Sequence, residues 1–143
     1  MKPVNQRTVH AGRGDCMRAA IASLLEMELE QVPNLVLWKS GDWFQTLYYF
    51  FFANGWQYVD HNPRPKRLFK KYSINGYYDA SVPSLTLPGR SHSVIVNLNG
   101  RVVHDPNPNK RWLNKNPLKT GKIKYVFHFV KRKNPNSFGK NAD

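Results

Sequence analysis

The 143-residue sequence predicts an α+β fold in which N-terminal helices pack on an antiparallel β-sheet. Helical periodicity is confined to residues 15–53, and short runs rich in β-branched and aromatic residues follow from residue 56 onward. The pair Asn99-Gly100, which separates two of these runs, is typical of a β-hairpin and therefore of antiparallel strands. At this length we expect one domain, residues 1–130, followed by a basic flexible tail, residues 131–143.

The first predicted helix begins after Asp15, which can act as its N-cap, so that Cys16 lies in the first turn. Apolar residues follow at the i, i+3, i+4 spacing of an amphipathic helix, and Gly12 and Gly14 punctuate its start. The segment ends at residues 32–34 (VPN), because a proline disfavours helical geometry in the residue before it.

A second helix is predicted from Asp42, as N-cap, to Ala53, and Asn54-Gly55 closes it. We interpret its aromatic run, residues 48–52, as core rather than as a platform for stacking bases, because the run continues the apolar face of the helix. Five strands are predicted to follow, over residues 56–59, 76–80, 93–98, 101–104 and 123–130. Loops rich in Pro, Asn and Lys are predicted at residues 60–73 and 105–122.

Charge is distributed unevenly along the chain, whose formal net charge is +13. Residues 1–60 hold 5 basic and 6 acidic side chains, whereas residues 61–143 hold 17 basic and 3 acidic ones. Such a field attracts nucleic acid, acidic proteins or anionic surfaces without specifying which. The longest strongly apolar stretch, residues 47–53, is far shorter than the ~20 residues that cross a bilayer. We therefore expect a soluble, cytoplasmic protein without a membrane partner.

The only cysteine, Cys16, is the first candidate for chemistry. A single cysteine excludes an internal disulfide and a Cys-rich zinc site, and the histidines lack metal-ligand spacing, so we expect no metal and no cofactor. The N-terminus of a helix favours the thiolate, which is the nucleophilic form of cysteine. A thiolate needs an imidazole to move the proton and a third side chain to orient that imidazole. His92 and Asp105 are the candidates for these two roles.

The predicted hairpin relates these candidates to one another. If Asn99 and Gly100 are the two loop residues, paired residues sum to 199, and His92 faces Asn107 while Asp105 is its diagonal neighbour. The expected Cβ separations are ~5 Å for the direct pair and ~7 to 8 Å for the diagonal one. Either side chain can hold the imidazole. His104 lies on the opposite face, and we interpret it as structural or exposed, like the remaining histidines at positions 10, 61 and 128.

The segments GDCMRAAIASLLEMELEQVPN and SHSVIVNLNGRVVHDPNP resemble compact papain-like cysteine peptidases, most closely the C39-like group and related small bacterial and phage proteins. The resemblance covers residues 5–108. It implies a papain-like fold in which Cys16 is the nucleophile, His92 the base and Asp105 the residue that orients the base. It also implies that Gln6 donates to the oxyanion hole. The spacing differs from the family pattern, since Gln6 lies ten residues before the cysteine rather than about six.

The resemblance implies a cysteine hydrolase, a peptidase or amidase, that acts through a thioester acyl-enzyme on a protein or peptide substrate. Deamidation and acyl transfer use the same machinery. The alternative is a non-catalytic basic protein that binds nucleic acid or an acidic protein, including one built on a degenerate cysteine-protease fold. Its candidate contacts are Asn107 and the basic residues Arg64, Lys66, Arg67, Lys70 and Lys71. The purely structural interpretation of these residues is that Cys16 is a small core residue and that the lysines form a solvated surface.

Overall fold

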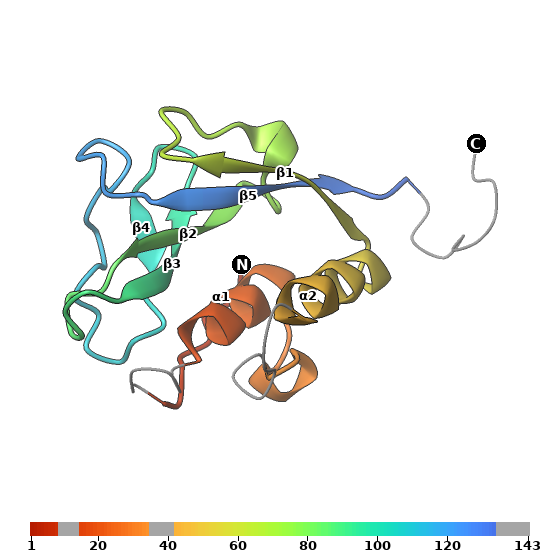
Figure 1. Ribbon diagram of the computed structural model, residues 1–143, viewed down its shortest axis with the longest axis horizontal. Helices are drawn as coiled ribbons and strands as arrows, with labels where there is room; N and C mark the ends of the chain where they lie inside the picture. Colours follow the sequence, from red (N-terminus) through yellow and green to blue (C-terminus); the bar gives the residue numbers. More distant parts are fainter. Residues whose placement is uncertain (9–14, 35–41, 134–143) are drawn as a thin grey trace.

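The computed structural model describes residues 1–8, 15–34 and 42–133. Two helices pack on one face of a five-stranded antiparallel sheet (Figure 1), which confirms the predicted α+β class. The elements are α1 (Cys16–Leu25), η1 (Leu29–Gln31), α2 (Asp42–Ala53), β1 (Trp56–Pro63), η3 (Lys70–Tyr72), β2 (Tyr77–Pro83), β3 (Ser91–Asn97), β4 (Val102–His104) and β5 (Tyr125–Lys131). The strand order is β1-β5-β2-β3-β4, so β1 and β4 form the edges of the sheet.

Helix α1 begins at Cys16, as predicted, but ends earlier than the predicted segment. Glu26 adopts the left-handed conformation with φ 55°, and its N–H bonds to carbonyl groups of the last turn. A single 3-10 turn, η1, precedes Pro33. Helix α2 matches its predicted bounds, and Gly55, with φ 90°, follows its end. The predicted roles of Gly12, Gly14 and the Asp42 side chain lie outside what the structure describes.

Two hydrophobic cores lie on the two faces of the sheet. The first lies between the helices and the sheet and includes Ile21, Leu47, Phe51, Ile95 and Phe129. The second lies on the opposite face, where loop residues cover the strands; its members include Leu68, Tyr78, Val94, Trp112 and Ile123. The predicted loops therefore carry the apolar side chains that close the second core. In the aromatic run of α2, Phe51 is buried as predicted, whereas Tyr49 is exposed.

All five predicted strands are present, but their extents differ. Strand β2 reaches Pro83 rather than Ala80, and β3 begins at Ser91 rather than Ser93. Strand β1 continues to Pro63, although residues 60–63 were predicted as loop. Proline cannot donate to a ladder, but it is tolerated on an edge strand, and β1 is an edge. Neither α1 nor α2, the two α-helices of the described ranges, has the length and apolarity that crossing a bilayer requires.

The β3–β4 hairpin differs from the predicted two-residue turn. The Asn97 N–H donates to the Arg101 carbonyl at 3.0 Å, so three residues form the loop, and the prediction that Leu98 faces Arg101 was wrong. Of the central pair, only Gly100 has positive φ, at 84°, whereas a type I′ turn needs positive φ at both residues. A register shift follows, and the ladder ends at the predicted pair of Ile95 with His104, so the predicted pair of His92 with Asn107 does not form.

Candidate active site

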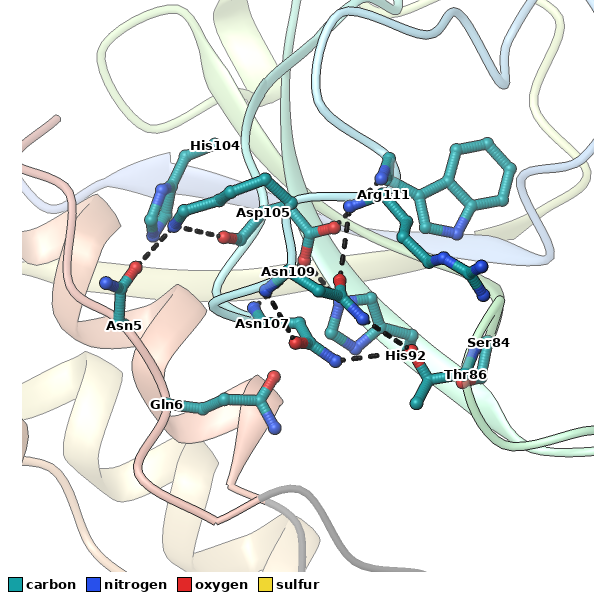
Figure 2. A network of polar contacts seen from close by, with 12 residues as sticks. Asn5, Gln6, Ser84, Thr86, His92, His104, Asp105, Asn107, Asn109 and Arg111 are labelled. Atoms are coloured by element: carbon teal, nitrogen blue, oxygen red, sulfur yellow. Dashed lines mark hydrogen bonds and ion pairs between the residues drawn. The ribbon is translucent and has the colours of Figure 1, made fainter.

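The fold brings Cys16, His92 and Asp105 together from three elements. Cys16 is the first residue of α1, His92 is the second residue of β3, and Asp105 directly follows β4. The His92 Nε2 atom lies 2.6 Å from Asp105 Oδ1 (Figure 2). Cys16 acts on the same ring, since its interaction with His92 raises the pKa of the imidazole. The cysteine is unpaired and half-buried.

The imidazole of His92 is buried beside Asp105. Only 8% of the residue is exposed, and this burial by itself lowers the pKa of the ring. The hydrogen bond to Asp105, the interaction with Cys16 and the charge of Asp105 outweigh burial and raise the pKa of His92 to about 9. The ring is therefore an imidazolium at neutral pH. It holds a proton that it can deliver to a leaving group.

Asp105 is the orienting partner of His92, and backbone groups fix its carboxylate. The residue is 1% exposed. Oδ1 accepts the Asn107 N–H at 3.0 Å, and Oδ2 accepts the Trp112 N–H at 3.0 Å. Burial raises the pKa of Asp105, but His92 and these two N–H groups lower it below its ordinary value overall. Lys110 Nζ donates to the Asp105 backbone carbonyl at 2.6 Å and so stabilises the loop that follows β4.

Asn107, the alternative partner of His92, has a different role. Its Oδ1 accepts the Asn109 N–H at 3.0 Å, and its Nδ2 lies 3.5 Å from Thr86 Oγ1. Asn109 Nδ2 also donates to Thr86, at 2.9 Å. These side chains join the loop after β4 to the loop before β3 (Figure 2). Among the described residues, no hydrogen bond joins Asn107 to His92, so Asp105 orients the ring.

Gln6 lies in the N-terminal segment beside this site. Its N–H donates to the Pro106 carbonyl at 2.9 Å, and its side chain is buried. The Nε2 group donates to the Thr8 carbonyl at 2.8 Å, while Oε1 is buried without a hydrogen-bond partner in the described part of the chain. The predicted oxyanion donor is thus close to the Asp105 loop, with its amide N–H group already bonded to backbone.

Asp15 anchors the same N-terminal segment. Its carboxylate accepts the Arg7 N–H at 3.1 Å and the Thr8 N–H at 3.0 Å. Asp15 is the N-cap residue of α1, as predicted, but its side chain makes no capping hydrogen bond to the helix. The Asp15 carboxylate lies at the start of the helix, but it accepts its hydrogen bonds from the backbone of Arg7 and Thr8 instead of from α1. The N–H groups of the first helical turn, next to Cys16, are therefore not consumed by this carboxylate.

The other histidines within the described ranges are packed elsewhere. His104 is buried, with Nε2 2.7 Å from the Val4 carbonyl, and His128 stacks on Tyr72 with ring centroids 4.8 Å apart. His61 is exposed on β1, and His10 lies outside the described residues. In the described parts of the chain, no three His, Cys, Asp or Glu side chains cluster in a way that could hold a metal ion.

The basic residues of the segment 64–71 form a separate surface. Arg64, Lys66, Arg67, Lys70 and Lys71 are all exposed. The same segment contributes Leu68 to the second core, on the sheet face opposite the helices. The segment therefore lies over the sheet face opposite the helices.

Sequence reasoning missed Asp79, on β2. Its Oδ1 atom is buried without a hydrogen-bond partner in the described ranges. Burial raises the pKa of Asp79 to about 7, against the opposing effects of a Ser93 hydrogen bond and the His92 charge. The signal was available, since Asp79 is the only charged residue in the strand sequence YYDASVP.

Comparison with protein-family models, with curated proteins and with solved structures found no match for the chain.

Proposed function

We propose that this protein is a papain-like cysteine hydrolase, a peptidase or amidase, in which Cys16 is the nucleophile. The observation that carries the proposal is the buried 2.6 Å contact between His92 and Asp105, in a ring whose pKa Cys16 also raises. A nucleophile, a base within hydrogen-bond reach and a third group that orients the base are the parts that covalent acyl transfer requires.

The reaction follows from the protonation state of the pair. The Cys16 Sγ atom attacks the acyl carbon, and the carbonyl oxygen becomes an oxyanion. The His92 imidazolium then gives its proton to the leaving group as the scissile bond breaks, which leaves a thioester on Cys16. Water attacks the thioester and His92 takes one proton of that water, which restores the imidazolium. The C–S bond then breaks, its electron pair returns to the Cys16 sulfur, and the carboxylic acid product leaves. Asp105 keeps the ring oriented throughout.

The oxyanion is stabilised by backbone N–H groups at the start of α1. Cys16 is the first helical residue, and Asp15 does not use the N–H groups of this turn for capping. Gln6 becomes a second donor when its Nε2 group turns from the Thr8 carbonyl to the substrate. The segment from Gln6 to Thr8 is held beside the helix start by Asp15, which supports this assignment.

Turnover of p-nitrophenyl acetate tests the proposal without knowledge of the natural substrate. We expect release of nitrophenolate and transient acetylation of Cys16, detected by intact mass. The variant Cys16→Ala should lose the acetylated species and the turnover that depends on it. His92→Ala should slow turnover by about 100-fold or more, as loss of a general acid–base group does. His61→Ala removes an exposed histidine on the β1 edge and is the matched control.

Native circular dichroism spectra of each variant establish that the fold is retained. Full turnover by folded Cys16→Ala would overturn the proposed mechanism. Equal loss of turnover in His61→Ala would show that the effect is not specific to His92.

A second candidate function is nucleic-acid binding by the segment 64–71. Its five basic side chains are exposed, and none forms a salt bridge with another described residue. Binding of a fluorescent single-stranded oligonucleotide should then weaken steeply with salt, survive Cys16→Ala and fail when the five residues are changed to Gln. Binding that is independent of salt, or that survives the fivefold change, would remove this candidate.

A further inference from the structure

The basic segment 64–71 also presents an aromatic ring to solvent. Phe69 is 43% exposed, whereas the preceding residue, Leu68, is buried in the second core. Arg67, Lys70 and Lys71, which flank the ring in the sequence, are exposed as well. A partner that approaches these cations therefore meets the ring of Phe69 at the same place.

The backbone that carries this ring is fixed by Tyr78, a buried residue of β2. The Tyr78 hydroxyl donates to the Phe69 carbonyl at 2.8 Å, and its oxygen accepts the Phe69 N–H at 3.3 Å. The 3-10 turn η3 follows, and the Tyr72 N–H also donates to the Phe69 carbonyl, at 3.1 Å. A fixed backbone leaves little conformational entropy to be lost when a ligand covers the ring, which favours binding.

Positive charge surrounds the ring. Lys71 Nζ lies 6.0 Å from the centre of the Phe69 ring. No acidic residue occurs in the sequence from residue 61 to residue 78. The Arg64 N–H donates to the Lys124 carbonyl at 2.9 Å, so the exposed Lys124 continues the basic surface onto the loop before β5. The ring therefore lies in a field that attracts an anionic ligand.

A single-stranded nucleic acid complements both features of this surface. Its phosphates pair with cations, and each of its bases has a flat face that can stack on an aromatic ring. The carboxylates of an acidic protein pair with the cations only, and the bases of a duplex are stacked on one another.

We propose that Phe69 stacks against a base of a single-stranded nucleic acid whose phosphates contact the basic residues of segment 64–71. The inference rests on the nucleic-acid binding proposed above for this segment. It adds the class of strand that binds and the residue that contacts the bases.

Two fluorescent oligonucleotides of equal length test the inference. One is a thymidine oligomer, and the other is an abasic oligomer, which has the same sugars and phosphates but no bases. Their dissociation constants are measured by fluorescence anisotropy at one fixed salt concentration, because phosphate contacts depend on salt. We expect the wild type to bind the thymidine oligomer at least about fivefold more tightly, the low end of the effect of stacking one base on an aromatic side chain.

The ratio of the two dissociation constants is compared between variants, because a ratio cancels the contribution of the phosphates. Phe69→Leu should reduce the ratio to about one and leave the affinity for the abasic oligomer unchanged, whereas Phe69→Trp should keep the preference. Phe44→Leu is the matched control, because it makes the same change at a ring that is 39% exposed on α2, on the other face of the sheet. A wild-type ratio of about one, or a preference that persists in Phe69→Leu, would overturn the inference.

Further measurements keep the test decisive. If Phe69→Leu does not fold, the tryptophan fluorescence of Phe69→Trp replaces it: the thymidine oligomer should quench the added signal and the abasic oligomer should not, and equal quenching would reject the stacking contact. Poly-L-glutamate at equal charge concentration should displace the thymidine oligomer poorly. Displacement as efficient as that by unlabelled thymidine oligomer would assign the surface to acidic polymers in general and overturn the inference.

Failure of the stacking contact can be distinguished from failure of nucleic-acid binding itself. Salt-dependent binding of both oligomers with a ratio of about one would reject the role of Phe69 and keep the binding by the basic residues. Binding of neither oligomer would reject both.

Discussion

At the scale of single residues, the site depends on how His92 is buried. An isolated buried histidine loses its proton, because burial disfavours the charged ring. Here Asp105 and Cys16 reverse that outcome and raise the pKa of His92 to about 9. Burial raises the pKa of Asp105, but the His92 hydrogen bond first, and then two backbone N–H groups, lower it below its ordinary value. The orienting residue and the polypeptide around it therefore act together on the imidazole.

This raised pKa predicts how stability depends on pH. A group whose pKa is higher in the folded than in the unfolded state stabilises the fold fully below the unfolded value of 6.5, and this contribution is lost as the pH rises through about 9. Relative to His92→Gln, the wild type should therefore lose up to about 3 kcal/mol of unfolding free energy between about pH 6 and about pH 10. Urea unfolding of both proteins across this range measures the difference.

A difference between wild type and His92→Gln that stays constant across the range would contradict the predicted ion pairing. The acid limb has the opposite sign, because the pKa of Asp105 is lowered on folding. Its contribution is present above the ordinary carboxyl range and is lost as the pH falls through the lowered value. The unfolding free energy of Asp105→Asn is compared with that of Asp60→Asn, which changes an exposed carboxylate. This comparison separates the contribution of Asp105 from the general protonation of acidic groups.

The sequence predicted which residues meet at the site better than it predicted what each contacts. Cys16, His92 and Asp105 could be selected because their chemistry is distinctive and a helix start and a hairpin place them. The choice between Asp105 and Asn107 depended on the backbone after β4, which leaves the ladder. The contacts of Asp15 and Asp79 depend on segments distant in sequence, and no local pattern encodes them.

At the scale of elements, the β3–β4 hairpin determines where Asp105 lies relative to His92. Its three-residue loop needs positive φ at Gly100, which a glycine adopts without strain. The position is also crowded, since a Cβ atom built there would lie 2.8 Å from Leu118 Cδ2 and 2.9 Å from Asn116 Oδ1. The loop therefore needs glycine at this position both for its backbone conformation and for its close packing against Leu118 and Asn116. This packing holds the register shift of the hairpin in place.

Gly100→Ala should destabilise the protein by about 2–4 kcal/mol, from backbone strain together with a steric clash. Gly76→Ala is the matched control, because Gly76 has φ +90° and nothing lies within 4 Å of its built Cβ. That control should cost about 1 kcal/mol, from strain alone. Chemical denaturation of both variants measures the two values. Equal losses would show that the packing of Leu118 on this turn does not contribute.

The bounds of an element were predicted well where local sequence determines them, and poorly where hydrogen bonding between strands determines them. Periodicity and flanking residues placed α2 at its observed bounds. The same reasoning extended the first helix too far, because Glu26 takes a left-handed conformation that its residue type does not signal. The Asn99-Gly100 pair correctly predicted a hairpin, whereas the loop length followed from how Asn97 and Arg101 bond across the strands.

At the scale of the whole molecule, the sheet separates two surfaces with different chemistry. On one face, α1 carries Cys16 to the strand that bears His92, and the first core lies between both helices and the sheet. On the other face, basic loops cover the second core through buried residues such as Leu68 and Trp112. Composition alone showed the charge imbalance but could not show that the segment 64–71 lies over the sheet face opposite the helices.

The central claim is that His92 activates Cys16, and the rate of alkylation of Cys16 by iodoacetamide tests it most directly. The rate is measured at about pH 6 for the wild type, His92→Ala and the control His61→Ala, each with native folding verified. The account predicts a fast reaction in the wild type and in His61→Ala, and one at least about tenfold slower in His92→Ala. A slow thiol whose rate does not change with His92 would contradict the account.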